Sequence, residues 1–305
     1  MAPAIRELVA RALAVDGVAA VSGHVLDAVG AGSADWLTLQ GAPAGEPAGP
    51  ELAGVAVAVA NDPAEVVVNP ALRGRGHGTG LVEAALDRQG AVWAYGDLPA
   101  AGAIARRLGL ARVRVLLQMR LTPDRPGPEH MVAETTPARP LPPGVRLRTF
   151  VPGRDEESFL AVNGRAFAWH PEQGRLDLAG LRAEMAQSWF DPEGFFLAVA
   201  EEDPDRVLGF HWTKIHRDDP TPGPDGPSTP LGEVYVIGVD PAAGIRGLGA
   251  PLTTAGVEHL RDRGARTVML YVEGDNDRAL RLYERFGFRV HVTSTVYAPP
   301  SSAAR

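Results

Sequence analysis

The chain has 305 residues, of which 45% are hydrophobic and 22% are charged, and its formal net charge is −7. This length accommodates two domains of about 150 residues, each with its own core. The acidic balance disfavours nucleic acid as the main partner, because phosphate backbones are bound by basic surfaces. The absence of cysteine excludes disulfides, thiolate metal sites and a cysteine nucleophile.

No apolar run reaches the roughly 18–20 residues that a membrane-spanning helix needs. The opening MAPAIRELVARAL contains Glu7 and lacks both the continuous apolar stretch and the cleavage site of a secretory signal. The histidines include no pair at the spacing of metal ligands on a helix. We therefore expect a cytoplasmic monomer that binds neither membranes nor nucleic acid and holds no metal.

The first half of the chain alternates strands with helices. A helix begins almost at Pro3, and no strand is expected before it. The periodicity then predicts strands at 36–40, 52–60, 65–68 and 92–95, and helices at 76–88 and 100–108. Residues 122–143 hold seven prolines and no periodic apolar pattern, which indicates a linker between a domain at 1–121 and a domain at 144–300.

The second half shows the same plan more clearly. Helices are predicted at 156–167, 178–189, 246–263 and 277–286, and strands at 145–149, 195–201, 207–214, 233–239, 267–273 and 289–297. Residues 216–231 are expected to form a loop between two antiparallel strands. The pattern predicts an α+β fold with a mixed sheet in each half.

One motif occurs twice: EVVVNPALRGRGHG at 65–78 and VIGVDPAAGIRGLG at 236–249. Each is an apolar run, a polar residue before Pro, and a Gly-rich turn that opens a helical segment. Pro70 and Pro241 are 171 residues apart, a repeat too long for a solenoid and typical of a duplicated domain. Such a turn presents backbone N–H groups at the positive end of a helix dipole, so each copy predicts a phosphate-binding site. A tight structural turn is the alternative interpretation.

Neither copy has the G-x-G-x-x-G pattern of dinucleotide folds, and no Walker lysine follows either turn. The strand, the Asp/Asn-Pro pair and R-x-x-G-x-G resemble instead the coenzyme A pyrophosphate loop of the GNAT acetyltransferases. The run GDNDRALRLYERFGF at 274–288 resembles their second signature, in which Asn276 and Tyr283 precede a Gly-Phe turn. The resemblance implies two tandem GNAT (acyl-CoA N-acyltransferase) domains, each a mixed central sheet flanked by helices, and acetyl-CoA as the acetyl donor.

Four further segments resemble a tandem branch of this family: AVDGVAAVSGHVLDAV (14–29), NGRAFAWHPEQG (163–174), GFHWTKIH (209–216) and LGEVYVIGVDPAA (231–243). Members of that branch acetylate the cysteinyl amine of desacetylmycothiol, a cysteinyl-glucosaminyl-inositol. The resemblance spans nearly the whole chain apart from the linker and the last residues. It implies a small-molecule amine as partner.

The resemblance also assigns roles to residues of this chain. The residues that would contact the sugar-inositol substrate are Glu172, Lys214, Glu233 and Tyr271. Those that would hold coenzyme A in the second half are Ile237, Gly238, Val239, Gly244, Ile245, Arg246, Gly247, Leu248, Gly249, Ala250, Asn276, Asp277, Arg278, Ala279, Leu280 and Arg281. Those that would form an acetyl-CoA site in the first half are Val66, Val67, Val68, Gly74, Arg75, Gly76, His77, Gly78 and Thr79.

Acetyl transfer to an amine needs a base for the ammonium, a donor for the developing oxyanion and an acid for the leaving thiolate. Glu233 is the predicted base, acting through a water, and Tyr283 the predicted acid. The strand N–H near Val239 would be the oxyanion donor. The alternatives are that Glu233 is an exposed strand-start acid paired with Arg and that Tyr283 is a core aromatic. Alignment of the halves places Ala105 opposite Tyr283, so the first half is expected to be degenerate and non-catalytic.

Two positions depart from the family pattern. Gly244 stands where Gln or Arg is usual, and Gly23-His24 follow Val-Ser where an acidic substrate contact is expected. Two other functions stay open: a GNAT acetyltransferase for a different small amine, and a non-catalytic acetyl-CoA-binding sensor.

Overall fold

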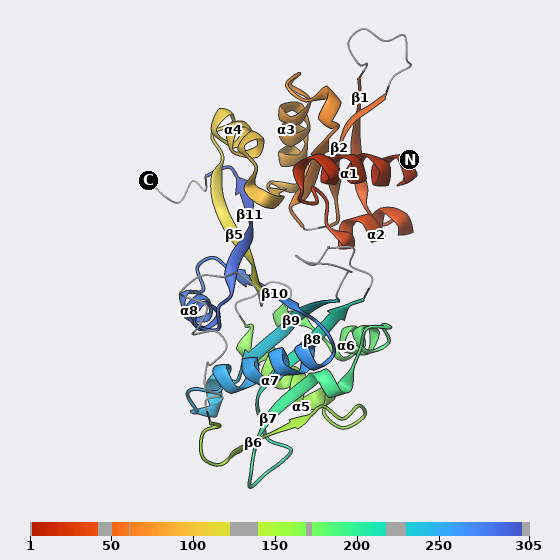
Figure 1. The fold of residues 1–305 in the computed structure, drawn as a ribbon. Coiled ribbons are helices and arrows are strands. Elements are labelled where there is room, and N and C mark those ends of the chain that lie inside the picture. Colours follow the sequence, from red (N-terminus) through yellow and green to blue (C-terminus); the bar gives the residue numbers. More distant parts are fainter. Residues whose placement is uncertain are drawn as a thin grey trace. The chain divides into compact units, whose positions relative to one another are not determined.

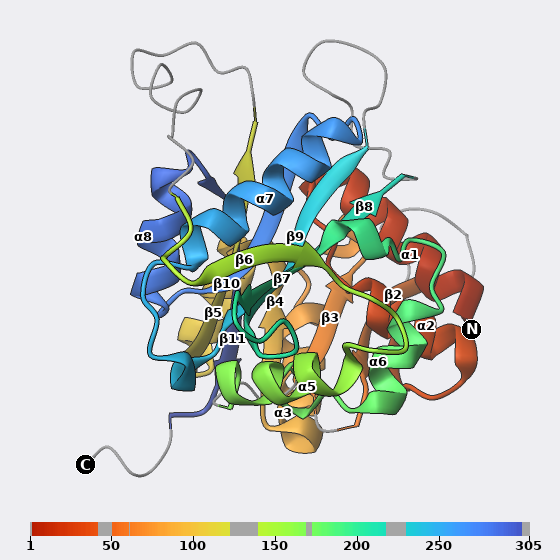
Figure 2. The same ribbon diagram turned by 90° about the horizontal axis from the view of Figure 1, so that it is seen from below.

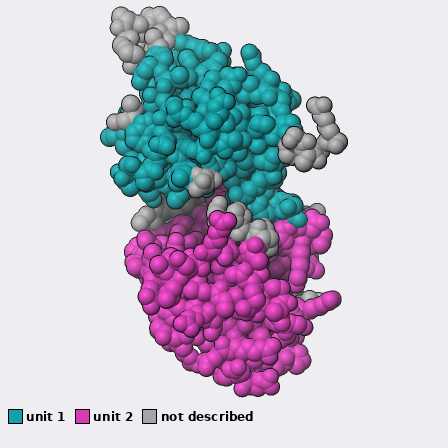
Figure 3. Space-filling view, turned by 180° about the vertical axis from the view of Figure 1, so that it is seen from behind, with its two compact units in different colours: residues 1–117, 273–275, 292–305 teal, residues 118–272, 276–291 magenta. Residues whose placement is uncertain are grey.

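A computed structural model describes residues 2–41, 51–60, 62–122, 140–168, 173–217 and 230–300. The chain forms two compact units, coloured separately in Figure 3. Unit 1 comprises residues 1–117, 273–275 and 292–305, and unit 2 comprises residues 118–272 and 276–291. The domains predicted at 1–121 and 144–300 were inferred from the sequence repeat, whereas these two units are defined by the contacts within the structure. The predicted domain division therefore stays a prediction.

Unit 1 contains a mixed sheet with helices on both faces (Figure 1). Its helices are α1 (Ala2–Asp16), α2 (Gly23–Ala31), α3 (His77–Gln89) and α4 (Pro99–Arg107). Its strands are β1 (Asp35–Gly41), β2 (Glu51–Ala58), β3 (Ala64–Val68), β4 (Val92–Ala94) and parts of β5 (Ala111–Leu121) and β11 (Arg289–Ala298), in the order β1-β2-β3-β4-β11-β5. The β3–β4 pair is parallel, whereas β1–β2, β2–β3 and β4–β11 are antiparallel.

The faces of this sheet bury different sets of apolar side chains. Ile5 and Leu8 of α1 pack with Val55 and Val67 of the sheet on one face. The other face packs against α3 and α4, where the buried residues include Ala56, Leu81, Val92 and Ala105. Alternate residues of a strand point to opposite faces, which is why β3 contributes to both cores.

Unit 2 repeats the plan. Its strands are β6 (Val145–Thr149), β7 (Phe195–Ala200), β8 (Val207–His216), β9 (Leu231–Val239) and β10 (Thr267–Glu273), in the order β10-β9-β8-β7-β6. Its helices are α5 (Glu156–Ala166), α6 (Leu178–Met185), α7 (Gly249–Asp262) and α8 (Asp277–Arg285). The β9–β10 pair is parallel and the pairs from β9 to β6 are antiparallel. In Figure 2, α7 lies on one side of the strands β6–β9 and α5 and α6 on the other.

The predicted elements are present with small shifts at their ends. Helix α7 begins at Gly249, three residues after the predicted start, because Gly244 and Gly247 have φ of 69° and 90°, which the preceding loop requires. Strands β8 and β9 are antiparallel as predicted, and residues 218–229 of the predicted loop between them lie outside the described residues. The described part of the chain holds no strand before β1, also as predicted. No described helix is long and apolar enough to cross a membrane.

Helix α2 and strand β5 were not predicted from the sequence. Helix α2 has nine residues, and the Ser22 side chain caps it by accepting the Val25 N–H at 3.3 Å. Strand β5 carries ARVRVLLQMRL, in which Arg alternates with apolar residues, and this period of two is a strand signal.

In unit 2, a buried histidine packs directly on helix α7. His211 of β8 has no solvent exposure, and its Nδ1 lies 2.7 Å from the Leu252 carbonyl oxygen. Because a carbonyl only accepts, Nδ1 carries a proton, and since burial lowers the pKa of His211 to about 4, the ring is neutral at pH 7. Gly256 makes room for the ring, since a Cβ there would lie 2.0 Å from His211 Cε1.

Gly256→Ala should destabilise unit 2. Alanine normally favours a helix interior over glycine by about 1 kcal/mol, but here the methyl group would enter the imidazole, and overpacking costs roughly 1–3 kcal/mol or more. The free energy of unfolding in urea, followed by tryptophan fluorescence, measures the effect. Gly80→Ala in α3 is the matched control, since its Cβ would meet nothing within 4 Å. Equal loss in both variants would contradict the packing argument.

Acid should weaken unit 2 through His211. Burial lowers the pKa of His211 from 6.5 to about 4, so between these values the unfolded chain binds a proton that the folded chain does not. The free energy of unfolding therefore falls as the pH is lowered from 6.5 towards 4, by about 3 kcal/mol at most. His211→Asn keeps a donor for the Leu252 carbonyl and removes the titration. Urea midpoints measured across this pH range should show a shallower slope for the variant, and parallel slopes would refute the assignment.

Candidate active site

The repeated motif forms the same turn in both units. The Asn69 side chain accepts the Ala71 N–H at 3.2 Å, and the Asp240 side chain accepts the Ala242 N–H at 2.9 Å. In each case the following Pro opens a short 3-10 turn. An Asx turn followed by proline ends the strand abruptly and leads the chain toward the Gly-rich loop.

In unit 1 the parallel strands β3 and β4 diverge after a short ladder, whose last pair is Glu65 with Trp93. The Asn69 N–H donates to the Ala53 carbonyl of β2 at 2.8 Å. Because backbone groups alternate between the two edges of a strand, the N–H and C=O groups of Val66 and Val68 point to the β4 side. Beyond the last pair these groups face the divergence.

The same geometry occurs in unit 2. The ladder of β9 and β10 ends at Val234 with Leu270, and the Asp240 N–H donates to the Leu208 carbonyl of β8 at 2.9 Å. Alternation then directs the backbone groups of Ile237 and Val239 to the divergent edge. The register also shifts between Trp212 and Thr213 of β8, which leaves Tyr235 as an extra residue in β9, a β-bulge. The Val239 N–H thus lies beyond the β9–β10 ladder because the two strands diverge, and not because of the bulge.

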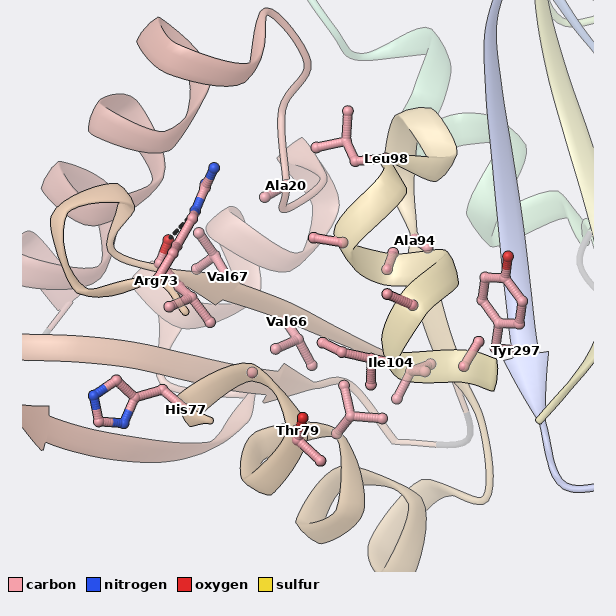
Figure 4. A pocket seen from close by; sticks show the side chains of 18 of the residues that line it. Ala20, Val66, Val67, Arg73, His77, Thr79, Ala94, Leu98, Ile104 and Tyr297 are labelled. Atoms are coloured by element: carbon pink, nitrogen blue, oxygen red, sulfur yellow. Dashed lines mark hydrogen bonds between the residues drawn. The ribbon is translucent and has the colours of Figure 1, made fainter. Parts of the chain in front are cut away.

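A cavity of about 440 Å³ occupies the divergence in unit 1 (Figure 4). The residues of the first-half prediction that line it are Val66, Val67, Val68, Gly74, Gly76, His77, Gly78 and Thr79. Arg75 is not among the lining residues. Figure 4 shows Thr79 and His77 at the start of α3 and Ile104 on α4 around the same space. The cavity therefore combines apolar walls with the N-terminal backbone of a helix, which suits a phosphate joined to a less polar arm.

Other lining residues were not in the first-half prediction: Arg73 belongs to the motif but precedes Gly74, and Asp16, Tyr95 and Tyr297 lie outside the motif. Arg73 donates to both carboxylate oxygens of Asp16 at 2.7 Å. The Tyr297 hydroxyl of β11 donates to Asp97 at 2.8 Å. None of these residues was predicted, because their positions in the motif or in the chain carry no local signal of a cavity wall.

A buried carboxylate lies at the junction of β3 and β4. The Glu65 side chain accepts the Tyr95 hydroxyl at 2.6 Å and the Ser22 N–H at 2.7 Å, and Glu65 is 3% exposed. Burial raises the pKa of Glu65 even though both hydrogen bonds favour its ionised form. Glu65 thus ties β3 to the turn that follows β4 and to the start of α2.

Glu233, the predicted base, is buried within β9. It is 7% exposed, it is the third residue of the strand, and its Oε2 lies 2.6 Å from Nε2 of His216. The alternative of an exposed strand-start acid paired with Arg does not fit this environment.

The substrate candidates that the structure describes share one face of the unit 2 sheet. Lys214 lies directly opposite Glu233 in the β8–β9 register, and Glu233 lies beside Met269 of β10, two residues before Tyr271. Tyr271 is half exposed and accepts a hydrogen bond from Gln118 at 2.8 Å. Glu172 lies outside the described residues.

Lys214, the only lysine of the chain, is held among aromatic rings. Its Nζ lies 4.4 Å from the centre of the Trp189 ring and 5.1 Å from that of Tyr235. Such cation–π contacts fix an ammonium without neutralising its charge. The positive charge of Lys214 therefore remains available on the face that also carries Glu233.

Tyr283, the predicted acid, lies on α8 next to the phosphate turn. It is 5% exposed, and its ring meets the edge of Phe288 with centroids 5.7 Å apart. Burial raises the pKa of Tyr283, which keeps the phenol protonated at neutral pH. A Cβ on Gly249 would lie 3.2 Å from Leu282, so the start of α7 and helix α8 are neighbours. Asn276 caps α8 by accepting the Ala279 N–H at 3.1 Å.

Comparison with known proteins supports the predicted fold and family. A family model described as "Acetyltransferase (GNAT) family" matches residues 163–288. Two solved structures share the fold. The GCN5-related N-acetyltransferase from Sphaerobacter thermophilus is 23% identical with a TM-score of 0.64, and the alignment covers 97% of this chain and 91% of that one. The tandem GNAT protein from the clavulanic acid biosynthesis pathway is 18% identical with a TM-score of 0.60, covering 97% and 93%.

Curated relatives carry a more specific name. The mycothiol acetyltransferase of Saccharomonospora viridis is 50% identical over 241 residues, which are 78% of this chain and 74% of the relative. That of Nocardia farcinica is 46% identical over 303 residues, 97% of this chain and 93% of the relative. These findings confirm the tandem GNAT fold and the resemblance. The chain therefore belongs to the mycothiol acetyltransferase family and is an acyltransferase.

Proposed function

We propose that the chain transfers an acetyl group from acetyl-CoA directly to the cysteinyl amine of desacetylmycothiol and thereby forms mycothiol. The observation that carries this proposal is the common face of Lys214, Glu233 and Tyr271 beside the divergence of β9 and β10. An ammonium, a carboxylate and a phenol suit a hydroxyl-rich substrate that carries an amine. The name of the curated relatives supports the same substrate.

Acetyl-CoA, when bound, supplies the acetyl group as a reactive thioester. In unit 2, the backbone groups of Ile237 and the Val239 carbonyl would pair with the pantetheine arm. The turn at 244–250 would hold the pyrophosphate and residues 276–281 would complete the site. Two observations support the fit: the strand edge left unpaired by the divergence and the positive φ of Gly244 and Gly247. The cavity of unit 1 would take a second acetyl-CoA.

Glu233 would act as the general base. His216 holds one of its oxygens at 2.6 Å, which orients the carboxylate on the substrate face. The acceptor arrives as an ammonium, so its proton must leave before its nitrogen attacks. A water between Glu233 and the amine would carry that proton.

Tyr283 would act as the general acid. Its buried phenol keeps its proton at neutral pH and could give it to the departing thiolate. The Val239 N–H would donate to the oxygen on which negative charge develops. Unit 1 has the buried Ala105 at the position aligned with Tyr283, so we assign catalysis to unit 2 alone.

Two alternatives are tested together with this function: a GNAT enzyme for another small amine and a non-catalytic acetyl-CoA sensor. Coenzyme A release from acetyl-CoA should be fast with desacetylmycothiol and slow with polyamines, aminoglycosides and amino acids. Preference for another amine would replace the substrate assignment. Coenzyme A binding without turnover of any amine would favour the sensor.

Glu233→Gln and Tyr283→Phe should each lower kcat by about a hundredfold or more, because each removes one proton-transfer group. Coenzyme A affinity, measured by calorimetry, should stay within a few-fold of that of the parent chain. Glu157→Gln changes an exposed carboxylate of α5 and is the matched control for unit 2. Turnover at the parental rate in either catalytic variant would remove that residue from the mechanism.

A further inference from the structure

An ion pair in the unit 1 cavity has no counterpart at the same place among the described residues of unit 2. Asp16 is the last residue of α1, and Arg73 stands just before Gly74 in the phosphate turn. The Arg73 guanidinium donates from both terminal nitrogens to the two carboxylate oxygens of Asp16, each at 2.7 Å. Both residues line the cavity, and Figure 4 shows Arg73 reaching into it.

The same arginine also covers a backbone group of β3. Its Nε donates to the Val68 carbonyl at 3.3 Å, and that carbonyl points into the divergence. In the proposed function this edge receives the pantetheine arm. Arg73 therefore satisfies Asp16 and Val68, while the neighbouring backbone cradle and the start of α3 are arranged for a phosphate.

Unit 2 has a glycine at the corresponding position. Arg73 is the third residue after Pro70, and Gly244 is the third residue after Pro241. With no side chain at 244, nothing from this position can cover the strand edge. The acid of the turn, Asp240, instead pairs with Arg165 of α5, at 3.0 and 2.7 Å.

We propose that Asp16 competes with the anionic pyrophosphate of coenzyme A for Arg73, and so weakens coenzyme A binding in unit 1 only. This inference rests on the proposed function, in which the cavity takes acetyl-CoA. A pyrophosphate in the turn attracts the guanidinium as strongly as a carboxylate does, because both offer paired anionic oxygens. Arg73 has to leave Asp16 to meet it, and its departure also uncovers the Val68 carbonyl.

The arrangement makes the competition costly for the ligand. The Asp16 side chain is 9% exposed, so solvent screens its pair with Arg73 less than it screens a surface pair. Binding has to replace two charge-assisted hydrogen bonds before it gains new ones. Removing the charge of Asp16 should therefore tighten coenzyme A binding roughly fivefold or more.

A double-mutant cycle tests the proposal in the full chain. Ala250→Glu places a negative charge at the start of α7 and silences the unit 2 site, so that calorimetric titration with coenzyme A reports the unit 1 cavity. In this background Asp16→Asn should lower the Kd by roughly fivefold or more, and Arg73→Gly should raise it. Asp16→Asn should have no effect once residue 73 is glycine. Glu51→Gln breaks a different ion pair of α1, that with Arg11, and should leave the Kd unchanged.

A Kd that is unchanged or raised by Asp16→Asn would overturn the competition. So would an equal effect of Asp16→Asn with and without Arg73, because the aspartate would then act on the ligand directly. If the Ala250→Glu chain is folded but binds no coenzyme A even after Asp16→Asn, the cavity is not a coenzyme A site and both this inference and the unit 1 part of the proposed function fail. Thr79→Glu gives the converse test: it should silence unit 1, and Asp16→Asn should then leave the remaining binding unchanged.

Discussion

The divergence of two parallel strands is the constraint on which the rest of each unit depends. A strand paired on both edges has no backbone group to offer a ligand. In each unit the parallel ladder ends before the strand does, after Glu65 in β3 and after Val234 in β9. The Asx turn and proline then send the chain away from the sheet and into the helix that covers one of its faces. An unpaired strand edge and a helix N-terminus thus meet at one place, although no single side chain is responsible.

The two units share this backbone and differ in the side chains placed around it. Unit 1 has Arg73 in its turn and Ala105 on α4, whereas unit 2 has Gly244 in its turn and Tyr283 on α8 at the aligned positions. The guanidinium in the turn of unit 1 forms an ion pair with Asp16, and the glycine of unit 2 has no side chain that could form one. The phenol of Tyr283 on α8 is a proton donor, and the alanine at the aligned position on α4 has none. Duplication therefore kept the cradle, which depends on backbone conformation, and let the units diverge where side chains decide the chemistry.

The same distinction explains how far the sequence could be interpreted. The turn, its glycines and the flanking strand and helix were predictable, since Asx-Pro, Gly and period-two runs act on their own neighbourhood. The cavity walls formed by residues that are distant in the sequence were not predictable. Tyr297 reaches the unit 1 cavity because β11 pairs with β4, and Asp16 reaches Arg73 across 57 positions. Glu65 resembled an ordinary strand start, and only packing brings Ser22 and Tyr95 to its two oxygens.

The two buried carboxylates, Glu65 and Glu233, differ in their surroundings, and this difference distinguishes a structural role from the proposed catalytic role. Glu65 receives a backbone N–H and a phenol, one at each of its two oxygens, and these contacts hold β3 to the neighbouring segments of unit 1. Glu233 meets the imidazole of His216 at its Oε2, on the face that also carries Lys214. The two donors favour the ionised form of Glu65, whereas its burial raises its pKa, so both its contacts and its burial belong to the packing of unit 1. Glu233 shares its face of the sheet with Lys214 and Tyr271, and this is why we propose the base in unit 2 even though both units bury a glutamate on the equivalent strand.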